Sequence, residues 1–430
     1  MAVEAAGIAW AAEEMVSTTV QVGIGAYMVS KPTMPLKATF NQIATSSDDA
    51  TRLSLSRADH TLSIVKEKAY IFGGQTAAGK LASNDIHAIN LMPGERMKSE
   101  YSVIPAVADT GSTQIPGARR KHAASSFNIC VAVYSGLDEN GKIIDEGSNI
   151  WLFNTDKNAW ESLEPANPGP GPRSSASLFD HDNNLLLYGG EDAQGKPLKD
   201  VWLYSYVRNT WTQLPEAPVA TTSAAAVNGW LHLISGSDSM SSDLHLLPIS
   251  PAQREEQEWH TIEFPTNPLT PGPRPRAGAG LIPITTGYGR HYLLYLFGAR
   301  KGSASTAHSE TEPPKVEQES SQLPQYWSDI WTYQLPSADV KPASITDSIK
   351  PAKIKDSIRS AFGVSSGGHS WSEVEVLPPT DMEAMAGKVH PGPRGFFGYD
   401  VAKDGRRVVV WGGINAKGEK EGDGWIIRLS

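Results

Sequence analysis

The chain has 430 residues, of which 40% are hydrophobic, with 39 glycines, 30 prolines and 12 tryptophans. Its formal net charge of −9 disfavours nucleic-acid binding, and no apolar run is long enough to span a bilayer as a helix. The single cysteine, Cys130, excludes an internal disulfide framework and favours a reducing compartment, so we expect a cytoplasmic protein without a membrane partner.

Residues 1–35 are the segment that the sequence defines least. Residues 2–15 are rich in alanine and predict a short helix, and residues 20–29 (VQVGIGAYMV) predict a strand or a packed extended segment. No basic region precedes an apolar stretch, so the start is not typical of a signal peptide. We expect an N-terminal arm over residues 1–35, packed on a single domain that spans residues 36–430.

From residue 36 onward, short strand-like runs bounded by Gly, Pro, Asn and Asp recur in sets of four. Residues 169–214 show the pattern most clearly, with SSASLF, LLLYGG, VWLYSY and TWTQL in succession. Such runs are typical of an antiparallel meander. Length alone would suggest two or three domains, but a repeated unit favours one closed array.

Six such units are predicted, starting near residues 57, 119, 173, 220, 274 and 394. The sixth unit contains only three strands, and the run at residues 36–43 (LKATFNQI) has no unit of its own. An N-terminal strand that completes the last sheet would close a ring without leaving a free edge. We therefore predict that the two ends of the domain pair in one sheet.

The repeated residues have physical reasons. Inner strands that converge on an axis have room only for small side chains, and paired glycines such as Gly189-Gly190 allow backbone torsions that a Cβ would oppose. Large rings, such as Trp211, fill the wider outer gap. These features resemble the kelch family of β-propellers, in particular the stand-alone kelch proteins common in fungi. The resemblance implies an all-β, six-bladed kelch-type β-propeller closed by an N-terminal strand.

Two insertions interrupt the fifth unit. The first, at about residues 299–325, is rich in Ser, Glu and Pro, and we expect a mobile loop. The second, at about residues 337–369, contains PAKIKDSIRSAF at residues 351–362. Apolar residues lie on one helical face of that segment, which predicts a short helix packed on the side of the propeller.

The resemblance implies a binding face at one mouth of the channel, built from the loop before each inner strand and the loop between the second and third strands. Five units have an arginine in the first of these loops, and the fourth unit has none. A ring of guanidinium groups would attract an anionic ligand or an acidic peptide, although each arginine alone could equally pair with a local carboxylate. The expected ligand-binding residues are Arg57, Arg119, Arg173, Arg274, Arg394, Phe396 and Phe397.

His60 and His122 each follow such an arginine by three residues, so two imidazoles could act as acid and base near the mouth. As inner-strand residues they could equally be buried and hydrogen-bonded. No cluster of His, Cys, Asp and Glu has metal-ligand spacing, and no glycine-rich phosphate loop or catalytic serine elbow is present. We expect neither a metal nor a cofactor.

Two functions fit this sequence. The first is binding of a small organic ligand at the channel mouth, and its enzymatic form would be a cofactor-free biosynthetic enzyme that catalyses a cyclisation or cycloaddition, such as a hetero-Diels–Alder reaction, by positioning its substrate. The second is a non-catalytic scaffold that docks an acidic segment of another protein on the arginine-bearing mouth. The sequence predicts neither the ligand nor the oligomeric state.

Overall fold

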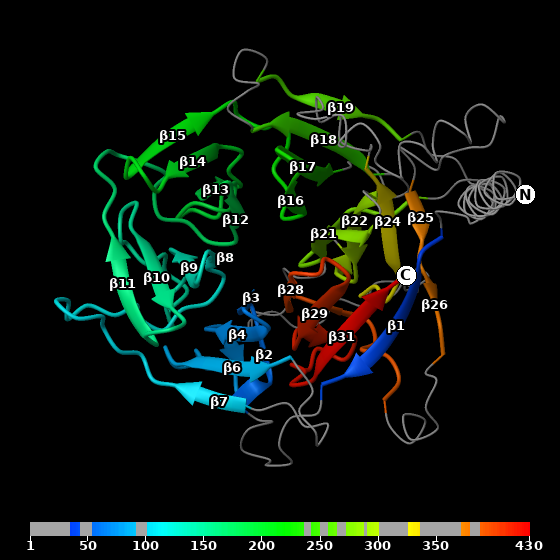
Figure 1. Cartoon of the computed structure of the whole chain (residues 1–430), viewed down its shortest axis with the longest axis horizontal. Helices are drawn as coiled ribbons and strands as arrows, with labels where there is room; N and C mark the ends of the chain where they lie inside the picture. The colour runs from blue at the N-terminus through cyan, green and yellow to red at the C-terminus, as the bar shows by residue number, and fades with distance from the viewer. Residues whose placement is uncertain are drawn as a thin grey trace, which may run out of the picture.

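Six antiparallel sheets surround a central axis, and the first strand of each sheet lies innermost (Figure 1). This computed structural model describes residues 35–43, 54–91, 101–235, 242–249, 257–264, 272–287, 290–300, 326–335, 371–378 and 388–430. The predicted all-β six-bladed propeller is confirmed. The predicted arm, the predicted helix at 351–362 and most of both insertions lie outside the described residues.

Each of the first three blades is a four-stranded meander in chain order. Blade one contains β3 (Thr61–Val65), β4 (Lys68–Phe72), β6 (Ile86–Asn90) and β7 (Tyr101–Ile104); blade two contains β8 (Ala123–Phe127), β9 (Cys130–Tyr134), β10 (Ile150–Asn154) and β11 (Ala159–Leu163); blade three contains β12 (Ser177–His181), β13 (Asn184–Tyr188), β14 (Val201–Ser205) and β15 (Thr210–Leu214).

The last three blades follow the same order, except that blade six is completed from both ends of the chain. Blade four contains β16 (Ala224–Val227), β17 (Trp230–Ser235), β18 (Asp243–Pro248) and β19 (His260–Ile262); blade five contains β21 (Gly280–Gly287), β22 (Arg290–Leu296), β24 (Ile330–Gln334) and β25 (Trp371–Glu373); blade six contains β28 (Gly398–Val401), β29 (Arg407–Trp411), β31 (Gly424–Leu429), β1 (Lys37–Gln42) and β26 (Glu375–Val376).

The N-terminal strand closes the ring as predicted. β1 pairs antiparallel with β31 through five residue pairs, from Ala38–Leu429 to Gln42–Trp425. Its other edge pairs in parallel with β26, which follows directly on the fourth strand of blade five. The sequence did not indicate this added strand, which covers the outer edge of blade six and links it to its neighbour.

The hydrophobic core lies between blades rather than within one. Six clusters of buried residues each join two neighbouring blades. At the junction of blades one and two, for example, Phe72 packs against Trp160, with ring centroids 5.1 Å apart. Because every blade buries both of its faces against neighbours, the closed ring is what removes the apolar surface of the sheets from water.

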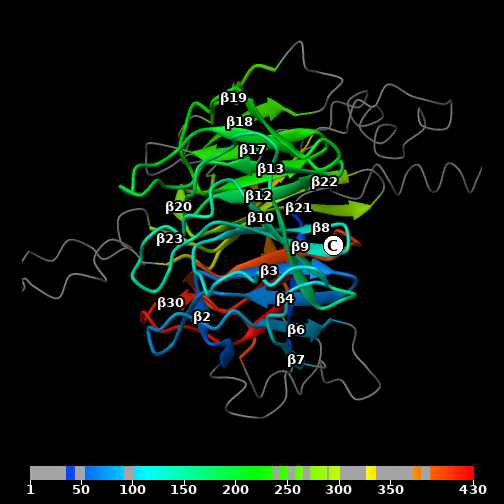
Figure 2. The same cartoon turned by 90° about the vertical axis from the view of Figure 1, so that its left-hand side faces the viewer.

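Short ladders mark one end of the ring. β2 (Arg57–Ala58) pairs with β5 (Gln75–Thr76), β20 (Arg276–Ala277) pairs with β23 (Ala299–Arg300), and β27 (Arg394–Gly395) pairs with β30 (Ile414–Asn415). Figure 2 shows β2, β20, β23 and β30 at the same end of the molecule. Each ladder joins the loop before the inner strand to the loop between the second and third strands. These two loops therefore form one mouth together.

A carboxyl group spans the junction where the last blade meets the first. The amide of Ile64 in blade one donates to Asp400 Oδ2 of blade six at 2.7 Å, and the amide of Val401 donates to Asp400 Oδ1 at 2.7 Å. Burial disfavours the charged carboxylate and raises the pKa of Asp400 from 3.8 to about 7, although both donors act in the opposite direction.

We predict that Asp400→Asn flattens the pH dependence of stability. The raised pKa means that the folded protein binds this proton more tightly than the unfolded chain, so ionisation of Asp400 lowers the free energy of unfolding as pH rises from 3.8 towards about 7. The variant should therefore gain stability relative to the wild type between about pH 5 and about pH 8 in urea unfolding. The exposed Glu216→Gln should show no such gain, and an equal gain in both variants would contradict the role of Asp400.

Candidate functional site

A belt of left-handed residues surrounds the mouth. In each of five blades, the residue two positions after the mouth arginine has a positive φ between 53° and 58°. We call this set the mouth belt: Asp59, Lys121, Ser175, Gly278 and Phe396. Non-glycine residues rarely adopt this conformation, which costs about 1–2 kcal/mol per residue, so its repetition indicates that surrounding contacts enforce it.

Backbone hydrogen bonds between blades enforce this conformation. Ser175 N donates to Lys121 O at 2.7 Å, Lys121 N to Asp59 O at 2.9 Å, Asp59 N to Phe396 O at 3.0 Å and Phe396 N to Gly278 O at 2.9 Å. The belt therefore runs without interruption from blade three through blades two, one and six to blade five. It ties neighbouring mouth loops together at a fixed spacing.

The glycine pairs form a second connection between blades. The amide of the second glycine donates to the carbonyl of the next blade's arginine, as from Gly74 to Arg119 at 2.9 Å and from Gly136 to Arg173 at 3.0 Å. A Cβ added at Gly73 would lie only 2.3 Å from Arg119 O. The next blade's backbone therefore leaves no room for a side chain at Gly73, whereas Ser135 and Phe297 occupy the equivalent position in blades two and five with a positive φ.

The mouth arginines hold these loops from within. Arg119, Arg173 and Arg394 are at most 4% exposed, and each donates to a carbonyl after the second strand of its own blade. Each also forms a two-point ion pair, with Glu146, Asp200 and Asp423 respectively. Their guanidinium groups already have partners, so binding of a ligand by them stays a prediction that burial disfavours.

In blade five the mouth arginine is Arg276, whereas the sequence analysis assigned Arg274. Arg276 is buried and contacts both carboxylate oxygens of Asp329 at 2.7 Å. Arg274 is only half-buried and lies over the Trp327 ring, 5.6 Å from its centroid. The segment GPRPRAGAG offers two arginines two residues apart, and the local spacing alone could not decide between them.

Arg57 in blade one uses an imidazole where the other blades use a carboxylate. Its Nη2 lies 2.9 Å from His87 Nε2, and His87 Nδ1 lies 2.7 Å from the Tyr101 hydroxyl. Burial and the neighbouring guanidinium lower the pKa of His87 to about 3, and burial lowers the pKa of Arg57 to about 10. Neutral His87 can therefore accept a hydrogen bond from the arginine.

Blade four lacks all of these connections. Residues 215–235 contain no arginine, and none of residues 219–223 has a positive φ. Thr222, which like the mouth-belt residues lies two positions before the inner strand of its blade, forms no belt hydrogen bond, and the amide of the neighbouring Thr221 donates to the Tyr188 hydroxyl at 3.2 Å. A Cβ added at Gly189 of blade three would meet only Leu198 O, at 3.2 Å, because no backbone of blade four approaches it.

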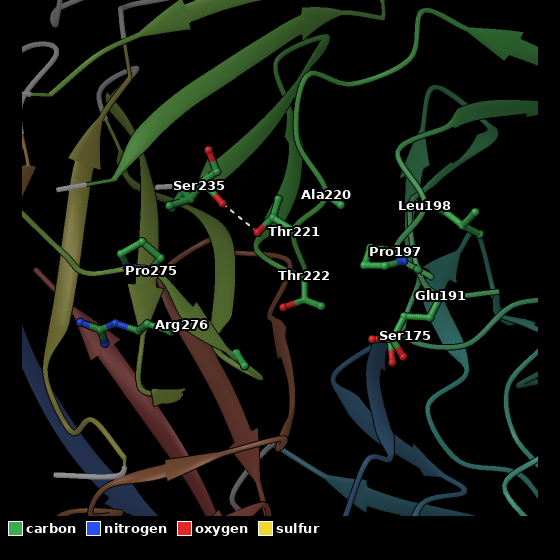
Figure 3. Close-up of a pocket in the computed structure, with 13 residues that line it drawn as sticks. Ser175, Glu191, Pro197, Leu198, Ala220, Thr221, Thr222, Ser235, Pro275 and Arg276 are labelled. Atoms are coloured by element: carbon green, nitrogen blue, oxygen red, sulfur yellow. Dashed lines mark hydrogen bonds between the residues drawn. The ribbon is translucent and has the colours of Figure 1, made fainter. Parts of the chain in front are cut away.

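A cavity of about 240 Å³ occupies this break. Figure 3 shows blade three contributing Ser175, Glu191, Pro197 and Leu198, opposite Thr221 and Thr222 of blade four, with Arg276 of blade five on the third side. None of the site residues predicted from the sequence lines it. The missing arginine of the fourth unit was visible in the sequence, but the cavity that its absence leaves was not.

The two predicted catalytic histidines lie between blades. Each is only 5% exposed. His122 Nε2 lies 2.7 Å from Thr61 Oγ1 of blade one, and the amide of Gly398 in blade six donates to His60 Nε2 at 3.2 Å. Burial lowers the pKa of His122 to about 3 and that of His60 well below its ordinary value. Both rings are neutral at physiological pH, and proton transfer by them stays a prediction.

The two predicted aromatic residues lie in different places. Phe396 belongs to the mouth belt and is half-buried, whereas Phe397 belongs to the core between blades five and six, 5.6 Å from the Phe297 ring. Across the described ranges, no three His, Cys, Asp or Glu side chains are grouped to hold a metal ion. No helix in these same ranges is long and apolar enough to cross a membrane.

Comparisons with known proteins agree with this geometry. The model of the KLHDC2/KLHL20/DRC7 Kelch-repeats domain matches residues 59–298, more than half of the chain. The solved structure of YjhT superposes with a TM-score of 0.52 at 13% identity, covering 87% of this chain and 97% of that chain, which supports the fold alone.

Curated relatives match at low identity. Acyl-CoA-binding domain-containing protein 5 of Arabidopsis thaliana is 24% identical over 346 residues, covering 78% of this chain and 48% of that protein. N-(sulfonatooxy)prop-2-enimidothioate sulfolyase of Thlaspi arvense is 22% identical over 167 residues, 37% of this chain and 44% of that enzyme. The chain thus spans about half or less of the length of these relatives.

We predict that the mouth arginines stabilise the fold. Asp200→Ala leaves the buried Arg173 without its carboxylate, and breaking such a pair should lower the free energy of unfolding by about 3–5 kcal/mol. The matched control is Asp156→Ala, which removes an exposed pair with Lys66 and should cost at most about 1 kcal/mol. Equal losses in chemical denaturation would contradict this structural role.

Proposed function

Because the chain belongs to the kelch-repeat family of β-propellers, we propose that it is a binding protein whose small organic ligand occupies the cavity at the mouth of blades three, four and five. One observation carries the proposal. The mouth belt, the glycine contact and the arginine are all missing at blade four, where the cavity lies. Concave sites with a few convergent polar groups are typical of small-molecule binding.

The cavity is a different site from the ring of mouth arginines that the sequence predicted. Acidic ligands would need free guanidinium groups, but the mouth arginines of blades two, three, five and six are each held by a carboxylate of their own blade. The cavity instead is lined by polar side chains, such as Glu191 and Thr222, that form no described ion pair or hydrogen bond with the protein. This favours a small ligand in the cavity over an acidic protein segment laid across the ring.

A cyclisation catalysed by positioning would use the same site. Such catalysis needs a cavity that holds the substrate in one geometry with a few polar contacts, and it needs no metal. One of the matched relatives carries the name of an enzyme, a sulfolyase. Binding precedes any such reaction, so binding is the step to test first.

We predict that Thr222→Trp abolishes ligand binding without unfolding the protein. Thr222 is exposed at the edge of the cavity (Figure 3), so an indole there should block the cavity while changing the free energy of unfolding by only about 0.5 kcal/mol. The measurement is native mass spectrometry of wild type and variant purified gently from the protein's own host. Wild type should carry a mass of metabolite size that the variant lacks.

The control is Thr212→Trp, an exposed threonine on the outermost strand of blade three, which should retain the bound mass. A wild-type protein without a bound metabolite would contradict the proposal. So would a metabolite retained by Thr222→Trp, or a co-purifying polypeptide in its place, which would instead support the scaffold hypothesis.

A further inference from the structure

The described lining of the cavity contains one carboxylate, that of Glu191, and its position distinguishes blade three from the other blades. Glu191 directly follows the glycine pair, and its backbone pairs with Ser174 across the mouth ladder. The equivalent residues in blades one, two, five and six are Gln75, Leu137, Ala299 and Ile414. Among these described positions, only Glu191 is charged, and it borders the break in the belt.

The carboxylate of Glu191 makes no described contact that stabilises the fold. Within the described part of the chain it has neither a hydrogen bond nor an ion pair, in contrast to Glu146 and Asp200 near the same mouth. The hydroxyl groups of Ser175 and Thr222 are likewise without a described partner. Figure 3 shows these groups on the two sides of the cavity. An acidic acceptor and two hydroxyl groups are therefore available to one ligand.

Among the described residues that line the cavity, the one basic residue is Arg276, which Asp329 already neutralises through two contacts at 2.7 Å. No free cation in this described lining balances the carboxylate of Glu191. The chain as a whole carries a net charge of −9, which attracts cations over longer distances. The electrostatic character of the site thus favours a positively charged ligand group.

Apolar side chains form another part of the described wall. Pro197 and Leu198 adjoin Glu191, and Pro275 lies across the cavity from them (Figure 3). One carboxylate is too few for a divalent metal ion, which usually takes several oxygen ligands. An ammonium group needs only a carboxylate and one or two neutral acceptors for its three donors. A ligand with an apolar body and a single ammonium end would match both parts of the wall.

We propose that the cavity selects small amphipathic primary amines, with the ammonium bound by Glu191 and the hydroxyl groups of Ser175 and Thr222, and the apolar body placed against Pro197, Leu198 and Pro275. This inference rests on the proposed ligand-binding function of the same cavity and names its substrate class. The charge-assisted hydrogen bonds to Glu191 supply the selection against neutral analogues of equal shape.

The experiment uses two probes of matched shape, benzylamine and benzyl alcohol, titrated into the full chain and followed by saturation-transfer NMR. Wild type should bind benzylamine at least about tenfold more tightly than benzyl alcohol, as expected for one charged hydrogen-bonded contact. Glu191→Gln keeps the size of the side chain and should remove this preference. The matched control is Glu139→Gln, an exposed glutamate in the corresponding loop of blade two, which should keep it.

The outcomes separate the inference from the proposed function. Amine selection is overturned if wild type shows no saturable benzylamine binding, or if Glu191→Gln binds benzylamine as tightly as wild type does. Loss of selectivity in Glu191→Gln together with loss of both probes in Thr222→Trp supports it. A host-derived ligand that Thr222→Trp displaces but Glu191→Gln retains would leave the cavity function intact and contradict amine recognition alone.

Discussion

The architecture of the mouth depends on one interaction, the backbone hydrogen bond that four of the five mouth-belt residues donate to the corresponding residue of the preceding blade. Side-chain packing joins the blades along their faces, whereas these bonds, together with those from the glycine pairs to the next blade's arginine carbonyl, set the spacing of the loops at the mouth. They require a left-handed residue in each loop, and the buried arginine supports that loop through a carbonyl and, in four blades, a carboxylate. At Gly73 and Gly412 the next blade's backbone comes equally close and leaves no room for a Cβ.

Relaxing this constraint at one blade creates a site without disturbing the rest of the ring. Blade four keeps its share of the core, with Leu231, Leu233 and Leu247 buried against blade three. Its mouth loop is held through side chains instead, since the Thr221 amide donates to the Tyr188 hydroxyl of blade three and the Thr221 hydroxyl donates to Ile234 O at 2.8 Å. The backbone of this loop therefore does not join the mouth belt, and the resulting cavity exposes groups that the other blades use for structure or lack.

The fold could be predicted from the sequence because short sequence motifs that recur in each blade specify it. Turn residues, glycine pairs and outer tryptophans recur in each unit, and the orphan strand at residues 36–43 matched the deficit in blade six. The site was harder, because an arginine in a mouth loop has the same local sequence whether it points at a ligand or at a carboxylate 27 residues later, as Arg173 does with Asp200. Only tertiary contacts distinguish these cases. Likewise, the candidate role of Glu191 depends on the cavity beside it, which is lined by residues of three different blades and so could not be predicted from any single segment.

The most direct test of this account is an experimental structure of the protein purified gently from its own host. The account predicts density for a non-protein molecule between Glu191 and Thr222, while the mouth belt stays closed from Ser175 through Asp59 to Gly278. A blade-four loop hydrogen-bonded to Ser175 and Gly278, completing the belt and leaving no cavity, would contradict it.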